Sequence, residues 1–295
     1  MKDNDYLRKP QWLKSNKVGA KRTSELTRKL RKYNLVTVCE DAKCPNRGEC
    51  FEKGTATFMI LGETCTRNCR FCAVDKTKKN LDLPDPNEPA AIAEVSHALG
   101  LKHIVVTTVT RDDLEDGGAT QFIKVVKEIR KKCNEDVTIE LLISDLKGNL
   151  EQVERIVKSA PDVLNHNVET VERLYSEVRP MANLEQSLQV LRKAKAVDPE
   201  ILTKSGFMVG LGEEKSEVLA LMKSLRSAGV DIVTIGQYMQ PTSNHYPVMK
   251  YVTPEQFAEY KQIGLELGFA LVESAPLVRS SYNAERARDI LLKRR

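Results

Sequence analysis

Strand-like and helix-like runs alternate along most of this sequence, and this alternation limits the fold more than any other feature. The expected strands are rich in β-branched and apolar residues and cover residues 57–61, 103–108, 137–143, 162–166, 202–209 and 232–236. The expected helices lie near residues 88–99, 119–133, 149–159, 184–197, 216–228 and 254–267. Six strand–helix repeats predict a parallel sheet with right-handed crossover connections.

The number of repeats bears on how this sheet closes. Six units fall short of the eight of a closed barrel, so the sequence predicts an α/β fold with a partial barrel. A six-stranded doubly wound sheet is the competing topology, and periodicity alone does not separate the two. In either fold, functional residues are expected at the carboxyl ends of the strands.

The composition fits a folded domain outside membranes. The chain has 295 residues, of which 41% are hydrophobic and 29% charged, a size that α/β barrels reach as single units. No apolar run approaches the roughly 20 residues that span a bilayer, and the first residues lead into no apolar signal segment. We therefore expect a soluble, cytoplasmic protein with no membrane partner. The net charge of +5 permits an acidic partner protein and does not argue for nucleic acid.

Six of the seven cysteines form two groups of three. The groups are Cys39, Cys44 and Cys50, and then Cys65, Cys69 and Cys72. In an intracellular chain such groups indicate metal binding or catalysis rather than disulfides. Structural zinc usually takes four Cys or His ligands, whereas each group stops at three and no histidine lies at a fitting spacing. Three thiolates suit a four-iron cluster in which one iron has a non-cysteine ligand. The seventh, Cys133, is expected to be a small buried side chain.

The second cysteine group directly follows the first expected strand, in the run Cys65-Thr-Arg-Asn-Cys69-Arg-Phe-Cys72. Cysteines with this spacing in this place resemble the radical S-adenosylmethionine enzymes. The resemblance implies a partial (β/α)6 TIM-like barrel and a [4Fe–4S] cluster on Cys65, Cys69 and Cys72 that binds S-adenosylmethionine through its unique iron. In that family, one electron from the cluster cleaves S-adenosylmethionine and releases a 5′-deoxyadenosyl radical.

Further segments narrow the resemblance to the lipoyl synthases within this superfamily. They are the first cysteine group and residues 107–119, 165–170, 236–242 and 279–282. The resemblance implies sulfur insertion at carbons six and eight of an octanoyl chain attached to a lysine of a lipoyl carrier domain. It also implies a second [4Fe–4S] cluster, which supplies the sulfur, on Cys39, Cys44, Cys50 and Ser281. The implied partners are octanoylated carrier domains of dehydrogenase complexes or the glycine-cleavage H protein, and a reductant such as flavodoxin or ferredoxin.

Six residues are expected to contact S-adenosylmethionine by the same resemblance. They are Gly117, Gly118, Asn167, Glu169, Arg179 and Gly210. The glycine pair matches the segment that approaches the methionine amino group, and Gly210 ends a strand that passes the adenine. Asn167 and Glu169 alternate after the fourth strand, so their side chains can point the same way, and a carboxylate can accept ribose hydroxyls. Arg179 is a candidate partner of the ligand carboxylate. Each assignment has a purely structural alternative. The glycine pair can form a plain turn, Asn167 and Glu169 can be a hydrogen-bonded pair at a strand end, and Arg179 can be a surface arginine.

The motifs suggest three parts of the chain. Residues 1–55 form an N-terminal extension with the first cysteine group, residues 56–270 the barrel, and residues 271–295 a C-terminal extension with the serine ligand. Tyr238 and His245 follow the sixth strand and are not included in the site, because a tyrosine packed in a core is the commoner case. Two other functions stay open: a biotin-synthase-like sulfur-inserting radical enzyme, and a non-enzymatic iron–sulfur protein. Cleavage of S-adenosylmethionine under reducing conditions would distinguish a radical enzyme from a non-enzymatic iron–sulfur protein.

Overall fold

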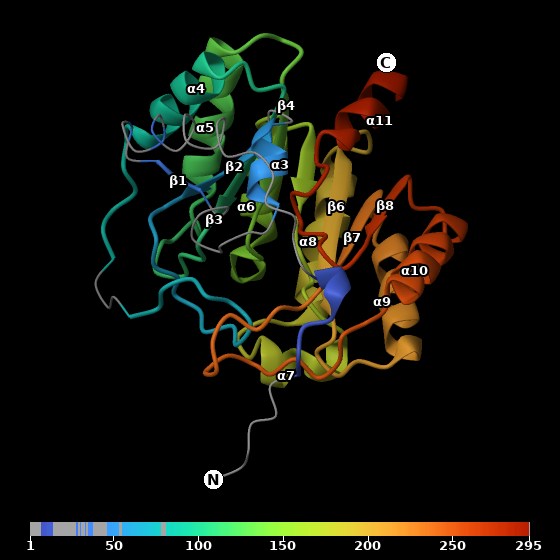
Figure 1. The fold of residues 1–295 in the computed structure, drawn as a ribbon. Coiled ribbons are helices and arrows are strands. Elements are labelled where there is room, and N and C mark those ends of the chain that lie inside the picture. The colour runs from blue at the N-terminus through green and yellow to red at the C-terminus, as the bar shows by residue number, and fades with distance from the viewer. Residues whose placement is uncertain are drawn as a thin grey trace.

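One sheet organises the part of the chain that the computed structural model describes, which is residues 7–13, 28, 30, 33, 35–37, 46–52, 55–77 and 81–294. Its eight strands run in the order β1-β2-β3-β4-β5-β6-β7-β8 (Figure 1). They are β1 (Val36–Thr37), β2 (Thr55–Ile60), β3 (His103–Thr108), β4 (Thr138–Leu142), β5 (Val163–Asn165), β6 (Leu202–Val209), β7 (Ile232–Gln237) and β8 (Leu271–Ser274). β1 pairs antiparallel with β2, and β2 to β8 are parallel.

Six helices connect the parallel strands. They are α4 (Glu88–Ala98), α5 (Ala119–Lys132), α6 (Leu150–Lys158), α8 (Leu184–Val197), α9 (Lys215–Ser227) and α10 (Pro254–Glu266). The other helical elements are α3 (Arg47–Glu52), α7 (Tyr175–Val178), α11 (Arg286–Arg294) and the 3-10 turns η1 (Gln11–Leu13), η2 (Leu146–Gly148) and η3 (Glu172–Leu174). None of the helices in the described ranges is long and apolar enough to cross a membrane.

The strand order decides between the two topologies that the sequence left open. Spatial neighbours are consecutive in the chain throughout the sheet, with no reversal of order. A doubly wound sheet requires such a reversal at its switch point. The alternative of a doubly wound sheet is therefore wrong, and the partial barrel of six strand–helix units is confirmed. β8 adds a seventh parallel strand after the last unit.

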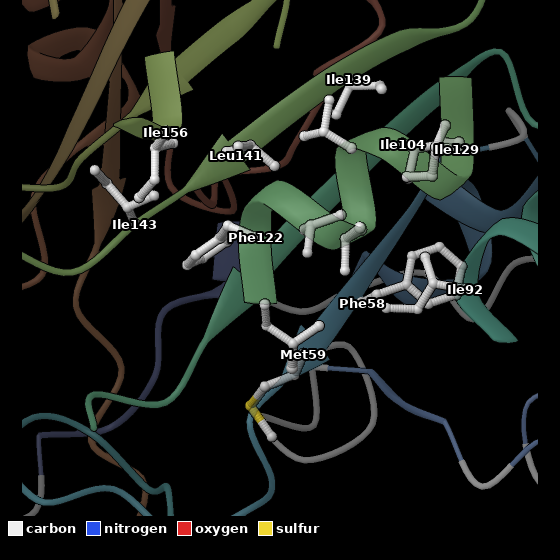
Figure 2. Close-up of a cluster of buried hydrophobic side chains, with 14 of the residues drawn as sticks. Phe58, Met59, Ile92, Ile104, Phe122, Ile129, Ile139, Leu141, Ile143 and Ile156 are labelled. Carbon is white, nitrogen blue, oxygen red and sulfur yellow. The ribbon is translucent and has the colours of Figure 1, made fainter. Parts of the chain in front are cut away.

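The outer face of the first strands is apolar because their hydrophobic residues share a register. Ile104 pairs with Ile139 and Val106 with Leu141, so both pairs project to the same side of the sheet. Figure 2 shows this side facing helix side chains, namely Ile92 of α4, Phe122 and Ile129 of α5, and Ile156 of α6. Burying one such side chain contributes about 1.5–3 kcal/mol, so this layer stabilises the first half of the barrel.

The inner face carries a buried charged network instead. Lys204 Nζ of β6 lies 2.9 and 3.1 Å from the two carboxylate oxygens of Glu140 of β4. His103 Nε2 and Asn165 Nδ2 bond the same carboxylate at 3.3 and 2.8 Å. Burial alone would raise the pKa of Glu140, but the charge of Lys204 and the bond with His103 lower it to about 2. The barrel interior therefore holds an ionised, hydrogen-bonded pair that joins β3, β4, β5 and β6.

Helix α11 closes the amino end of the barrel. Ala287, with Ile290 and Leu291 beside it, packs against inner residues near the start of their strands, which are Val163, Leu202 and Ile232. In Figure 1, α11 stands at the opposite end of the sheet from α7, which follows the carboxyl end of β5. With one end filled by apolar side chains, the carboxyl ends of the strands are left as the place for a functional site.

Candidate functional site

The loop after β2 carries Cys65, Cys69 and Cys72, as the spacing predicts. It is closed at its base by Cys65 N, which donates to Asp75 O at 2.8 Å. A tight turn follows, in which Cys72 N donates to Cys69 O at 3.2 Å. The three thiols are half-buried and form no disulfide. One short loop thus presents three thiols at the carboxyl end of the first parallel strand.

Arg67, between the first two cysteines, fastens this loop to the next two strands. Its guanidinium donates to Asp112 Oδ2 and Oδ1 at 2.7 and 3.0 Å, and to Asp145 Oδ2 and Oδ1 at 2.7 and 2.6 Å. Asp112 follows β3, and Asp145 follows β4. Arg67 is 5% exposed and Asp145 fully buried, so the bonds are shielded from water. Such paired bidentate contacts fix an arginine in one geometry.

A second set of contacts holds the other end of the loop. Lys76 Nζ donates to the carbonyl oxygens of Cys69 and Cys72, each at 2.9 Å. The ring of His245, in the loop after β7, lies with Nε2 3.1 Å from the same Cys72 oxygen. The other ring nitrogen lies 2.8 Å from Thr242 Oγ1. The cysteine loop is therefore braced from the far side of the barrel as well.

The chemistry of these thiols fits a cluster better than a single ion. Burial raises the pKa of Cys72 to about 11, and burial also raises that of Cys69 against the charge of Arg179. The raised pKa values of Cys69 and Cys72 favour their protonated forms, and metal binding to these two thiols releases protons. Among the described residues, no group of three or more Cys, His, Asp or Glu is placed to hold one metal ion. A four-iron cluster takes separate thiolates on separate irons, and three cysteines in one loop can supply them.

Three of the six predicted ligand contacts gather beside Cys69. Arg70 N, next to Cys69, donates to Val178 O at 2.8 Å, which brings the residue before Arg179 to the cysteine loop. The pKa of the Cys69 thiol is raised most by burial, lowered by the charge of Arg179 and raised by that of Glu169. Burial raises the pKa of Glu169, while Arg179 and a hydrogen bond from Asn167 oppose the rise. The Arg179 guanidinium lies 5.8 Å over the Tyr175 ring and donates to Asn167 O at 3.2 Å. A buried arginine and a half-buried glutamate therefore stand near the cysteine loop, where they could bind an amino-acid carboxylate and a sugar hydroxyl.

The packing of the chain itself requires glycine at the three predicted glycine positions. Gly118 has φ +94°, and a Cβ there would lie 2.2 Å from a methyl group of Leu61. A Cβ on Gly117, at φ +59°, would lie 3.1 Å from Leu146. At Gly210, with φ +96°, a Cβ would lie 2.1 Å from Gln237 Nε2. These turns need glycine whether or not a ligand approaches, so their ligand contacts stay a prediction.

The first cysteine group is only partly visible, because Cys39 and Cys44 lie outside the described residues. Cys50 lies on α3, and α3 is tied to the C-terminal loop that contains Ser281. Asn46 Nδ2, just before α3, donates to Leu277 O at 2.6 Å. Tyr282 OH donates to the carboxylate of Glu49, with O···O distances of 3.2 and 3.4 Å. The structure thus brings the helix of Cys50 next to the loop of Ser281, although these segments lie far apart in the sequence.

The C-terminal loop enters the barrel at a glycine of β7. A Cβ at Gly236 would lie 2.2 Å from Val278 O, so only glycine lets the loop backbone come this close. Farther along the loop, Ser280 Oγ lies 3.0 Å from Asn165 Nδ2 and 3.2 Å from Asn167 Oδ1. The loop therefore touches the residues that end β5, next to Glu169.

Several residues of this site were not singled out from the sequence. Arg67 lies within the cysteine loop and Lys76 directly after it, while Asp145 follows β4. Arg67 and Asp145 are 78 positions apart, so their contact leaves no local pattern. The only sequence signal was the place of Asp112 and Asp145 after strands. His245 was left out and contacts the cysteine loop, whereas Tyr238 is buried and donates to Tyr246 O at 2.6 Å.

Solved structures of other proteins share the fold. Methylornithine synthase (PylB) aligns with a TM-score of 0.56 at 12% identity, covering 80% of this chain and 81% of that chain. HydG, a maturase of the [FeFe]-hydrogenase, aligns with a TM-score of 0.54 at 13% identity, covering 91% and 74%. At such low identity these similarities concern the fold alone.

Sequence comparisons define the family. The model of the radical SAM superfamily matches residues 59–225. The lipoyl synthase of Alkaliphilus metalliredigens (strain QYMF) is 51% identical over 280 residues, covering 95% of this chain and 96% of that protein. The lipoyl synthases of Caldanaerobacter subterraneus subsp. tengcongensis and Caldicellulosiruptor bescii are 53% and 50% identical, with at least 95% of both chains covered. A match of this identity over nearly the full length of both partners means that the chain belongs to the lipoyl synthase family within the radical SAM superfamily.

Proposed function

We propose that this chain inserts two sulfur atoms into an octanoyl chain, at carbons six and eight. The octanoyl chain is carried on a lysine of a lipoyl carrier domain. The observation that supports this most strongly is the identity of 50–53% to proteins named lipoyl synthase over nearly the whole chain. The loop of three cysteines at the carboxyl end of β2 is the structural feature that agrees with it.

Membership of the radical SAM superfamily implies one [4Fe–4S] cluster and S-adenosylmethionine, and we assign the cluster to Cys65, Cys69 and Cys72. When bound, this pair supplies a carbon-centred radical that can take hydrogen from an alkane position, which no side-chain acid or base can deprotonate. The chain's own part is to hold the loop still. Arg67 does so through Asp112 and Asp145.

The residues beside Cys69 are proposed to bind S-adenosylmethionine. Arg179 would pair with its carboxylate, and Glu169 would accept hydroxyl groups of the ribose, with Asn167 orienting Glu169. A buried arginine suits this role because its planar fork matches a carboxylate. Gly117 and Gly118 are assigned to the methionine end and Gly210 to the adenine end, as their place in the motifs predicts.

A second [4Fe–4S] cluster is proposed on Cys39, Cys44, Cys50 and Ser281, where it would supply the sulfur. The contacts of Glu49 and Leu277 across the chain support this, because they bring α3 to the C-terminal loop. We keep the division into an N-terminal extension of residues 1–55 with the first cysteine group, a barrel of residues 56–270 and a C-terminal extension of residues 271–295 with the serine ligand. The sheet itself continues to Ser274 in β8.

The partners follow from the reaction. Octanoylated carrier domains would be the substrates, either of dehydrogenase complexes or the glycine-cleavage H protein, and a flavodoxin or ferredoxin would be the reductant. Another sulfur-inserting radical enzyme, of the biotin-synthase kind, is the alternative reaction. A non-enzymatic iron–sulfur protein is the alternative without catalysis.

An anaerobic assay tests the proposed function. Reconstituted protein is given a reductant, S-adenosylmethionine and an octanoyl-lysine peptide, and the products are read by mass spectrometry. We expect a peptide that carries two added sulfurs, together with released 5′-deoxyadenosine. Release of 5′-deoxyadenosine without added sulfur would move the substrate assignment to another radical enzyme. Protein with full clusters and no cleavage would contradict the enzymatic role.

Replacing Ser281 by Cys tests the proposed serine ligand. A serine oxygen is a harder donor than a thiolate and holds iron of an iron–sulfur cluster less firmly. We therefore expect Ser281→Cys to retain cluster iron and cleavage of S-adenosylmethionine while sulfur transfer falls. Iron content, 5′-deoxyadenosine and sulfur-bearing peptide are measured on one preparation. Undiminished sulfur transfer in this variant would count against a labile ligand at Ser281.

A further inference from the structure

We propose that Ser280 is a positioning residue that couples the S-adenosylmethionine site to the second-cluster site by fixing the side chain of Asn167. The inference rests on the proposed function and concerns a residue that has no assigned part in it. Ser280 bonds the side chains of Asn165 and Asn167 through its hydroxyl. Its importance lies in where its hydroxyl sits, between the strand end that carries Glu169 and the loop that carries Ser281.

The hydroxyl of Ser280 has a defined direction. Asn165 Nδ2 donates to it at 3.0 Å, and the same amide group donates to Glu140 Oε1 at 2.8 Å. Glu140 is fully buried beside Lys204, so it holds the donor end of Asn165 in place. Ser280 must then be an acceptor from Asn165, and its single proton goes to Asn167 Oδ1 at 3.2 Å.

This bond determines which end of the Asn167 amide faces the ligand site. Because Oδ1 accepts from Ser280, the NH2 group of Asn167 is left to bond Glu169, where it counteracts the effect of burial on the pKa. The side chain has little room to move elsewhere. A Cβ on Gly206 would lie 2.9 Å from Asn167 Oδ1, so the amide packs directly on the β6 backbone. Without the Ser280 proton, the amide could rotate and leave Glu169 without its donor.

The loop of Ser280 is anchored on the other side to α3. Leu277 O accepts from Asn46, and Tyr282 OH bonds Glu49, so α3 and the loop move together. Ser281 follows Ser280 directly, and a shift of one residue shifts the other. Loss of the second cluster should therefore disturb Asn167, and a ligand held by Glu169 should steady the loop. Such coupling between sites is reciprocal.

The test is a double-mutant cycle on the affinity for S-adenosylmethionine. Binding is measured anaerobically after reconstitution of both clusters in the parent chain and identical treatment of Cys50→Ala, Ser280→Ala and the double variant. We expect each single change to weaken binding by a factor of about 5 or more, as is typical of coupled sites. The double variant should bind no more weakly than the weaker single one, because both changes break one connection. Multiplied effects in the double variant would overturn the proposal.

Matched variants separate the effect of the Ser280 hydroxyl from the effect of side-chain shape. Ser280→Thr keeps the hydroxyl proton and should bind S-adenosylmethionine like the parent. Ser280→Val has the shape of the threonine variant without the hydroxyl and should bind like Ser280→Ala. Ser227→Ala, at the exposed end of α9, is the control for a serine elsewhere. Parental affinity in Ser280→Val contradicts the coupling. If the parent chain binds S-adenosylmethionine and the cycle is multiplicative, the coupling fails alone. If the parent does not bind it, the proposed function fails too.

Discussion

Cys65→Ala reduces the release of 5′-deoxyadenosine to background, whereas Cys50→Ala keeps this release at saturating S-adenosylmethionine and loses sulfur transfer. This is the expected result if the two cysteine groups hold clusters with separate tasks. Cys65 lies in the loop at the end of β2, and Arg67 of the same loop is held by Asp112 and Asp145. Cys50 lies on α3, which contacts the C-terminal loop through Glu49. 5′-Deoxyadenosine and sulfur-bearing peptide are quantified in the same reactions.

Cys133→Ala is the matched control for these substitutions. Cys133 caps the carboxyl end of α5, its thiol lies 3.8 Å from Ala93 O, and it belongs to neither cysteine group in the sequence. We expect this variant to keep both products, because a small half-buried side chain is lost without loss of a ligand. If Cys65→Ala and Cys50→Ala lose only sulfur transfer, the roles assigned to the two groups are wrong.

Arg67→Met should destabilise the fold by about 3–5 kcal/mol, because it leaves the buried Asp145 carboxylate without its partner. Asp112 is 16% exposed and can be solvated, whereas Asp145 is fully buried. The midpoint of denaturant unfolding measures the loss of stability, and the iron content after reconstitution measures the effect on the cysteine loop. Both should fall, since the loop loses its link to β3 and β4.

The pH dependence of this variant has a defined sign. In the parent chain burial alone would raise the pKa of Asp145, but the hydrogen bonds and charge of Arg67 lower it to about 2. This stabilisation is fully present above the unfolded-state pKa of about 3.9 and is lost as the pH falls toward the folded value. Without Arg67, burial raises the pKa of Asp145. The difference between Arg67→Met and parent should then be largest at neutral pH and shrink in acid.

Two controls identify the buried charge as the cause. Arg67→Met combined with Asp145→Asn should recover much of the lost stability, because the unpaired charge is removed. Arg192→Met breaks an ion pair with Glu185 whose side chains are 45% and 56% exposed, and we expect a cost of at most about 1 kcal/mol. Equal losses in Arg67→Met and Arg192→Met would contradict the importance of burial.

The periodicity of the sequence was enough for the repeating part of the fold. Six strands and six helices lie where β-branched runs and amphipathic runs predict them, because each element has its own local pattern. β8, a strand of four residues after the last predicted helix, was missed. The choice between a partial barrel and a doubly wound sheet also lay beyond periodicity. It depends on which strands pair, and pairing is a contact between distant residues.

The candidate site divides in the same way. The cysteine loop could be predicted because its three thiols lie within one short run of residues. The link from Arg67 to Asp145 could not, because the two residues are 78 positions apart and neither is unusual by itself. Ser281 came only from the resemblance to a family. Nothing local marks Ser280, whose role depends on Asn165 and Asn167, which lie 115 and 113 positions away in the sequence.

The contact between α3 and the C-terminal loop has a consequence for biosynthesis. Asn46 and Leu277 are separated by 231 positions, so at about 5–20 residues per second a ribosome adds Leu277 roughly 10–50 s after Asn46. During this interval the Cys65 loop and the strands around it can already fold. A nascent or truncated chain that stops after β8 has the residues for the radical-generating centre and lacks Ser281. On the proposed ligand assignment, only a completed chain could hold the sulfur-donating cluster, and an unfinished chain would have the residues for the first cluster alone.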